Sequence, residues 1–155
     1  MRIIVALFFI LFSYSAYAQD FSVSPVKINF RAQAGGKATK TLSILNNSNK
    51  EITIQLRNRD FVMLKNGKRK MLPAETSDHS IAPWLTFSPA FFSLNPNQSR
   101  NIDITLNAPS GDFSARWGII DVTPAKEWTS LTADKELETG LMLTGRISVL
   151  LTYNP

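Results

Sequence analysis

The 155-residue chain has no cysteine and a single histidine, His79. Without cysteine there can be no disulfide bond, so a packed core alone must stabilise the fold. The usual His and Cys ligand sets of zinc sites cannot form either. A serine triad would have to use His79, which follows Asp78 in a loop that ends at Pro83, and no Gly-x-Ser-x-Gly motif accompanies it. We therefore predict that the protein is not an enzyme and has no metal site and no cofactor.

Acidic residues are also scarce, with 12 Asp and Glu against 17 Lys and Arg. The acidic residues gather in one segment only, at Glu127, Asp134, Glu136 and Glu138. That segment lacks the glycine-spaced ligand pattern of a calcium loop. We interpret it as a solvated acidic loop.

The basic residues gather once, around the dipeptide Asn66-Gly67. The members of this cluster are Lys65, Lys68, Arg69 and Lys70. Asn-Gly suits the tight turn of a β-hairpin, which predicts a small hairpin over 61–73. Aromatic residues are not interleaved with the cations as a nucleic-acid stacking platform requires, so we predict no nucleic-acid partner. We interpret the cluster as a hairpin tip kept soluble by charge; contact with an envelope polyanion is the alternative.

Long hydrophobic runs are absent except at the start, where ten apolar residues, Ile3 to Phe12, follow Arg2. Such a run is too short to cross a bilayer of about 30 Å as a helix. It ends at Ala16-Tyr17-Ala18, the small-x-small pattern of a secretory cleavage site. We predict a cleaved signal peptide over residues 1–18 and a single mature domain over 19–155. The mature protein is expected in the periplasm or at the cell surface, without a membrane span.

The rest of the chain consists of short extended runs separated by turn residues. Ile52, Ile54 and Leu56 alternate with polar residues, as they do in a strand with one buried face. Seven or eight such runs, with turn signals roughly every 8 to 12 residues, predict an all-β, immunoglobulin-like sandwich of about seven strands. The apolar alternation changes parity at Pro25, which predicts a kink or bulge there. We expect Trp84 and Trp117 to anchor the core between the sheets.

The last run, Gly140 to Tyr153, is apolar on both parities and is predicted to be a strand. Two positions in the sandwich are compatible with this pattern. A central strand would be buried on both faces, whereas an edge strand would be an adhesive template for another chain. Proteins that keep such an edge use it to capture a partner by β-addition.

Several short motifs occur in an order that resembles one family. They are Ser24-Pro25-Val26-Lys27-Ile28-Asn29-Phe30, Leu45-Asn46-Asn47-Ser48, Pro89 with Leu94-Asn95-Pro96-Asn97-Gln98, Trp117 to Pro124, and Tyr153-Asn154-Pro155. Together they resemble the N-terminal domain of periplasmic pilus-assembly chaperones. They are equally similar to immunoglobulin-like cell-surface domains, including the peptidoglycan-binding domain of WxL-type proteins. The resemblance covers the mature chain and implies a seven-stranded immunoglobulin-like sandwich.

The chaperone resemblance also implies residues that contact a partner. In that family, alternating apolar residues of the last strand complete a pilin subunit, and these positions fall on Leu141 and Leu143, then on Gly145, which does not fit. Two basic residues of the family bind the subunit's terminal carboxylate. Lys27 matches the first of them, and Leu150 occupies the place of the second.

Arg146 has the same strand parity as Leu150, so it is the candidate for the missing cation. We therefore predict an exported, non-catalytic protein-binding module that captures an envelope or surface protein, such as a pilin-like subunit, at its last strand. The alternative is a structural or adhesive envelope domain that binds peptidoglycan or a surface polysaccharide.

Overall fold

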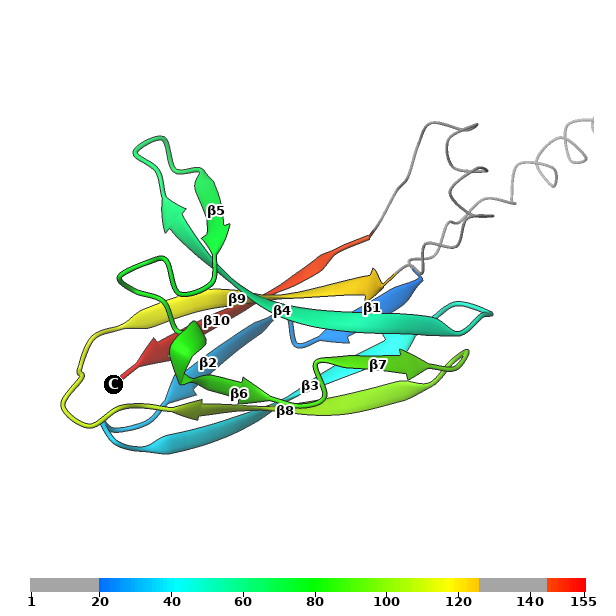
Figure 1. The fold of residues 1–155 in the computed structure, drawn as a ribbon, viewed down its shortest axis with the longest axis horizontal. Helices are drawn as coiled ribbons and strands as arrows, with labels where there is room; N and C mark the ends of the chain where they lie inside the picture. Colours follow the sequence, from blue (N-terminus) through cyan, green and yellow to red (C-terminus); the bar gives the residue numbers. More distant parts are fainter. Residues whose placement is uncertain (1–19, 126–144) are drawn as a thin grey trace, which may run out of the picture.

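A computed structural model describes residues 20–125 and 145–155 of the chain. Two β-sheets pack face to face in it (Figure 1). The elements in chain order are β1 (Phe21–Ser24), β2 (Lys27–Arg31), β3 (Lys37–Asn46), β4 (Ile52–Met63), β5 (Arg69–Pro73), the 3-10 turn η1 (Ala82–Trp84), β6 (Leu85–Phe87), β7 (Phe91–Leu94), β8 (Ser99–Asn107), β9 (Arg116–Ala125) and β10 (Ile147–Asn154).

One sheet has four strands in the order β1-β3-β8-β6, and the other has six in the order β2-β10-β9-β4-β5, with β7 also pairing with β4. Neighbouring strands are antiparallel except for β2 and β10, which run parallel. The predicted all-β, immunoglobulin-like sandwich is thus confirmed. The described residues form ten strands rather than about seven, because the first run divides at Pro25 and the 61–73 segment adds a hairpin.

The core lies between the two sheets, where the predicted alternation brings its apolar side chains together. Ile54 of β4 is fully buried, as are Leu42 and Ile44 of β3 and Ile102 and Ile104 of β8. Burying one such side chain contributes roughly 1.5–3 kcal/mol relative to leaving it exposed. Without a disulfide, this packing is the main stabilising term of the fold.

The parity change at Pro25 marks the place where the chain passes from one sheet to the other. β1 pairs with β3 in the four-stranded sheet, whereas β2 pairs with β10 in the six-stranded sheet. Val23 before the proline and Ile28 after it both point into the core. The predicted kink is therefore confirmed, and it leaves the early part of β10 without β2 as a neighbour.

The last strand, β10, is neither simply central nor simply an edge. From Leu150 to Asn154 it pairs with β2 on one side and β9 on the other. From Ile147 to Val149 it pairs with β9 alone among the described strands. The predicted positions 140–144 of this run lie outside the described residues.

The two predicted core tryptophans differ. Trp84 packs against the core and lies edge-on to Tyr153, with ring centroids 5.5 Å apart. Trp117 does not lie between the sheets, so that expectation was wrong. The residues of β9 that point into the core are Gly118 and Ile120, so Trp117 points to the outer face. There its ring stacks on that of the exposed His79, with the ring centroids 4.3 Å apart.

The predicted hairpin around Asn66-Gly67 is confirmed. Gly67 has φ of 77°, a left-handed conformation that glycine adopts without a Cβ clash. The Leu64 N–H donates to the Lys68 carbonyl at 2.8 Å and closes the turn. Among the residues that the structure describes, no helix is long and apolar enough to cross a membrane.

Candidate functional site: the outer face of the six-stranded sheet

Polar and charged side chains occupy the outer face of β4, β9 and β10, which lie side by side. Ser148 of β10 is the register partner of Asp121 of β9, and Asp121 is in turn the partner of Arg57 of β4. Side chains two residues apart share a face of a strand, so Arg59 and Arg146 lie on this outer face as well. The strand register therefore brings Asp121 together with β4 residues about 60 positions earlier in the chain and with β10 residues about 25 positions later.

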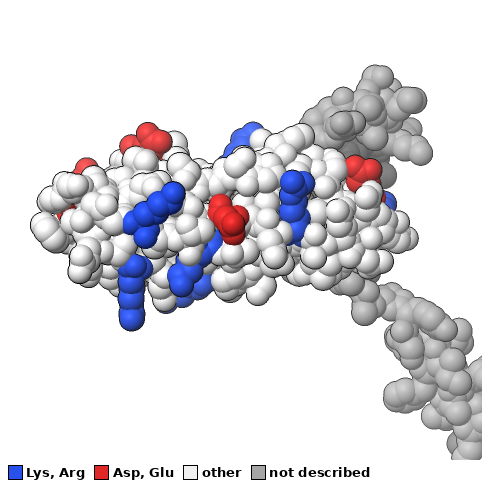
Figure 2. All heavy atoms as spheres, turned by 90° about the horizontal axis from the view of Figure 1, so that it is seen from below, with Lys and Arg blue, Asp and Glu red and all other residues white. Residues whose placement is uncertain are grey.

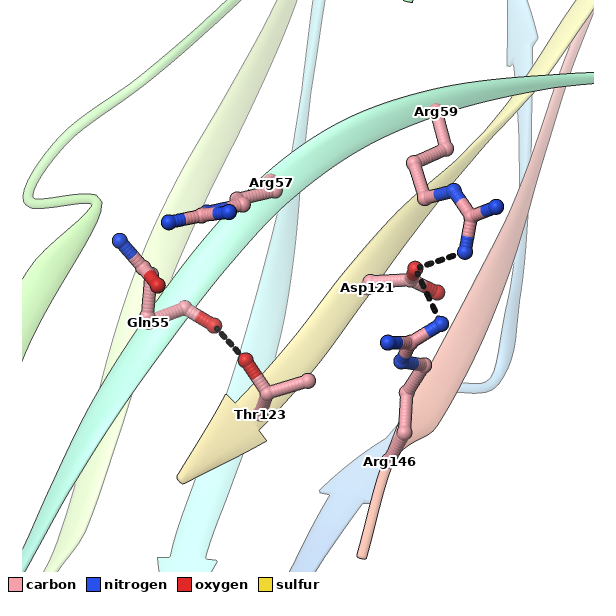
Figure 3. A pocket seen from close by; sticks show the side chains of 6 residues that line it. All are labelled: Gln55, Arg57, Arg59, Asp121, Thr123 and Arg146. Atoms are coloured by element: carbon pink, nitrogen blue, oxygen red, sulfur yellow. Dashed lines mark hydrogen bonds and ion pairs between the residues drawn. The ribbon is translucent and has the colours of Figure 1, made fainter. Parts of the chain in front are cut away.

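Asp121 is the centre of this group, with only 4% of its surface exposed. Its carboxylate accepts a hydrogen bond from the Ser148 hydroxyl at 2.6 Å. It also pairs with the guanidinium groups of Arg59 at 3.2 Å and Arg146 at 3.5 Å (Figure 3). A buried charge needs such partners, because removal of a carboxylate from water is costly. The contacts attach the start of β10 to β9 and β4.

A hollow of about 270 Å³ opens beside Asp121. It is lined by Gln55, Arg57, Arg59, Asp121, Thr123 and Arg146. Figure 3 shows Arg57 pointing away from the carboxylate. Three guanidinium groups and one carboxylate line the hollow, which therefore has a surplus of positive charge. Guanidinium groups bind carboxylates through paired hydrogen bonds, so this hollow suits an acidic group of a ligand. Among the described residues, no group of three His, Asp or Glu side chains could hold a metal ion.

A second hollow of about 270 Å³ lies on the same face, beside β2. Its lining is Lys27, Asn29, Phe30, Arg31, Ala115, Arg116, Trp117, Thr152 and Asn154. The Thr152 hydroxyl donates to the Asn29 side-chain oxygen at 2.6 Å across the parallel pair. The Trp117 indole N–H donates to the Phe61 carbonyl at 3.3 Å. This hollow is lined by amide, hydroxyl and basic groups.

The loop before β9 borders the second hollow and is stabilised by an ionised aspartate. Asp112 accepts hydrogen bonds from the Ser114 hydroxyl and backbone N–H, and it pairs with Arg116 at 2.7 Å. These donors, Ser114 first and Arg116 after it, lower the pKa of Asp112 from 3.8 to about 2. The Arg116 guanidinium also lies 4.7 Å from the centroid of the Trp84 ring.

The structure places the two predicted basic residues at separate points of this face. Lys27 is the register partner of Leu150, so the two positions implied by the resemblance are neighbours. Arg146 precedes Leu150 by four residues, about 13 Å along a strand, and it pairs with Asp121 rather than approaching Lys27. Leu141 and Leu143 lie outside the described residues.

Between these two cations, β10 has a backbone edge with which no described strand pairs. The Leu150 N–H donates to the Val26 carbonyl at 2.9 Å, on the β2 side of the strand. The N–H and C=O groups of residues two apart point to the same side, so those of Ser148 face the β2 side as well. No described strand pairs with Ser148 on that side.

Sequence reasoning missed Asp121, Arg57 and Arg59, although each carries a signal. Asp121 is a lone carboxylate in an otherwise apolar strand, and charged residues are rarely buried without a partner. Arg57 and Arg59 share the outward parity of a strand whose inward residues are Ile54 and Leu56. What the sequence alone does not contain is the register that brings these residues together.

No family model and no curated protein matches this chain. Solved structures do match it. The class 5 fimbriae chaperone CfaA has a TM-score of 0.61 at 15% identity, and the match covers 87% of this chain and 56% of that one. A chain of the CsuC–CsuE chaperone–tip adhesion subunit pre-assembly complex, from the archaic chaperone-usher Csu pili of Acinetobacter baumannii, has a TM-score of 0.56 at 14% identity, with 86% and 56% covered.

A third match is the PapD-like domain 7 of human CEP192, with a TM-score of 0.55 at 14% identity, and 92% and 94% of the two chains covered. The chain thus spans just over half the length of the two chaperone-related chains and nearly all of the isolated human domain. Identities this low concern the fold alone. The resemblance to the pilus chaperones is confirmed at that level, and the chain has their immunoglobulin-like fold.

Proposed function

We propose that this protein is an exported, non-catalytic binding module of the periplasm or cell surface that captures another protein by strand addition to β10. The observation that carries the proposal is that, among the described strands, none pairs with Ser148 on the side of β10 that β2 covers from Leu150 onward. A strand that pairs there would gain main-chain hydrogen bonds, which supply affinity in β-addition. The fold shared with fimbrial chaperones supports it.

Charge and apolar side chains would give this capture its specificity. Lys27 stands where β2 begins to cover β10, and Arg146 stands at the other end of the open part. Both are exposed, and they would attract acidic groups of the partner and hold its register. Leu141 and Leu143 remain the proposed apolar contacts on the sequence argument alone. The partner is an envelope or surface protein, with a pilin-like subunit as the leading candidate.

Site-specific cross-linking tests the proposal, because the chain has no cysteine of its own. Ser148→Cys places a unique thiol at the open part of β10. Thr39→Cys is the matched control on the exposed outer face of β3. Each variant is labelled with a photoreactive maleimide, irradiated in an envelope extract, and analysed by mass spectrometry.

The proposal requires a specific adduct from position 148 and none from position 39. The adduct should also slow hydrogen exchange at backbone amides on the open side of β10, because strand addition pairs them. Equal labelling of the same proteins from both positions, or an adduct without such protection, would contradict strand capture.

The alternative function, binding of peptidoglycan or a surface polysaccharide, would use the second hollow. Asn29, Thr152 and Asn154 supply amide and hydroxyl groups there, next to the Trp117 ring. However, one face of that ring stacks on His79 and the indole N–H is already bonded, which leaves less of the ring for a sugar. Shifts of the Trp117 indole NMR signal on addition of soluble peptidoglycan fragments would favour the alternative over strand capture.

A further inference from the structure

The hairpin made by the end of β4 and by β5 rises away from the sandwich (Figure 1). Its two strands pair from Arg59 with Pro73 to Met63 with Arg69. Asp60, at the base of the hairpin, is fully buried and accepts hydrogen bonds from Thr76, Ser77 and Ser80. The base of the hairpin is therefore fixed to the loop that follows it, while the tip is in solvent.

Four cations surround the tip without an acidic neighbour. All four are exposed: Lys65, Lys68, Arg69 and Lys70. The sequence has no Asp or Glu from Phe61 to Ala74, and no ion pair within the described segments involves these cations. By contrast, cations and carboxylates are interspersed among uncharged residues on the side of the molecule seen in Figure 2. The tip is thus a concentrated positive charge.

The same tip exposes two large apolar side chains. Met63 is 59% exposed and Leu64 is 41% exposed. A tip that needed charge only for solubility would gain nothing from them. Exposed apolar side chains next to a cluster of cations match an interface in which phosphate groups lie above hydrocarbon. There the cations bind the phosphates and the apolar groups insert.

We propose that this hairpin docks the protein on an anionic phospholipid surface, with Met63 and Leu64 entering the headgroup boundary. The proposal is independent of strand capture, which uses β10. Each Lys or Arg close to an anionic membrane strengthens binding by a factor of about five, so the hairpin cations together supply a substantial affinity. The Arg69 guanidinium also lies over the Phe61 ring, 5.2 Å from its centroid, and is exposed.

Vesicle flotation with the exported protein tests this. Binding is compared between vesicles of phosphatidylcholine alone and vesicles in which about 30% of the lipid is phosphatidylglycerol. The second composition carries the negative surface charge that attracts basic segments. Any binding that comes from apolar residues of the N-terminal segment also occurs with the neutral vesicles and is the same for all variants. It therefore does not affect the comparison. We expect clear binding to the anionic vesicles only.

The triple variant Lys65→Gln, Lys68→Gln and Lys70→Gln should bind the anionic vesicles on the order of 100-fold more weakly. A matched control, Lys37→Gln, Lys40→Gln and Lys50→Gln, removes the same charge from exposed sites near β3 and should bind within about threefold of the wild type. Circular dichroism checks that both remain folded. Equal weakening of the two variants would mean that net charge alone is sensed, and the proposal would fail.

A second variant separates a membrane from a soluble polyanion. Met63→Ser with Leu64→Ser should weaken vesicle binding by about tenfold, because it removes apolar groups that would be buried. It should leave binding to heparin, which has no hydrocarbon layer, unchanged. If vesicle binding survives this change intact and heparin competes for the same cations, the hairpin binds a soluble polyanion and membrane docking is wrong.

Discussion

The two halves of β10 both mix apolar and polar residues, but they have different neighbours. From Leu150 to Asn154 the strand has β2 and β9 on its two sides, and Tyr153 is fully buried. From Ile147 to Val149 it has β9 alone among the described strands, and the contacts of Asp121 attach it. One part is therefore paired on both sides, while the other has no described neighbour on the β2 side, where we propose that a partner strand binds. The difference arises because the chain enters the six-stranded sheet only after Pro25, so β2 begins beside Leu150 and does not reach Ser148.

If this comparison is correct, the largest effect on stability comes from the covered half. Tyr153→Ala should lower the free energy of unfolding by ~3–5 kcal/mol, as other large aromatic truncations in cores do. Tyr153→Phe removes only the hydroxyl, which donates to the Ala32 carbonyl at 3.0 Å, and should cost about 1 kcal/mol. Urea unfolding measures both. A loss below about 1 kcal/mol for Tyr153→Ala, well under the range for core truncations, would show that this half is not part of the core.

Trp117 tests the outer side of the same half, where it is the register partner of Thr152. Because Trp117 is only partly buried on the outer face, Trp117→Ala should cost ~1.5–2.5 kcal/mol, less than a truncation between the sheets. The midpoint of chemical unfolding gives the value. A cost as large as that of Tyr153→Ala would place the indole in the core after all.

Asp121→Asn tests the first part of β10, from Ile147 to Val149. It keeps the shape of the side chain but removes the charge that pairs with Arg59 and Arg146. Their side chains are 30% and 53% exposed, so solvent screens the pairs and the expected loss is about 1–2 kcal/mol. Hydrogen exchange should rise at the Ile147 amide, which faces β9 beside Asp121, more than at the Leu151 amide. Uniform acceleration along β10 would contradict a separate anchor for the first half.

The smallest expected effect concerns Asp112, in the loop that leads into β9. Its pKa is lowered to about 2, so the ionised form is favoured in the folded state. The stability that it contributes is present above its ordinary pKa of 3.8 and is lost as the pH falls toward 2. An NMR titration of the Asp112 carboxyl carbon should give a midpoint well below 3.8, and Ser114→Ala should raise it. A normal midpoint in the intact protein would show that the loop contacts do not persist in solution.

The sequence predicted the strands and the sandwich because the inward residues of Ile52–Met63 and Ser99–Asn107 alternate with polar ones. It also predicted the break at Pro25 from the change of parity. It placed Trp117 wrongly because β9 is apolar on both faces around Ile119 and Ile120, so its pattern has no polar side to identify. The cluster at Asp121 depends on strand register, which joins residues far apart in the chain and leaves no local pattern.

The open edge of β10 is the central claim, and native-state hydrogen exchange measured by NMR tests it most directly. The Leu150 amide, bonded to the Val26 carbonyl, should exchange at least ~100-fold more slowly than the Ser148 amide, which faces the open side. In the Ser148→Cys variant, cross-linking of a captured partner should then bring the amide at position 148 to the slow rate of the Leu150 amide. Equal protection of the two amides in the free protein would mean that the edge is already covered, and the account of strand capture would be wrong.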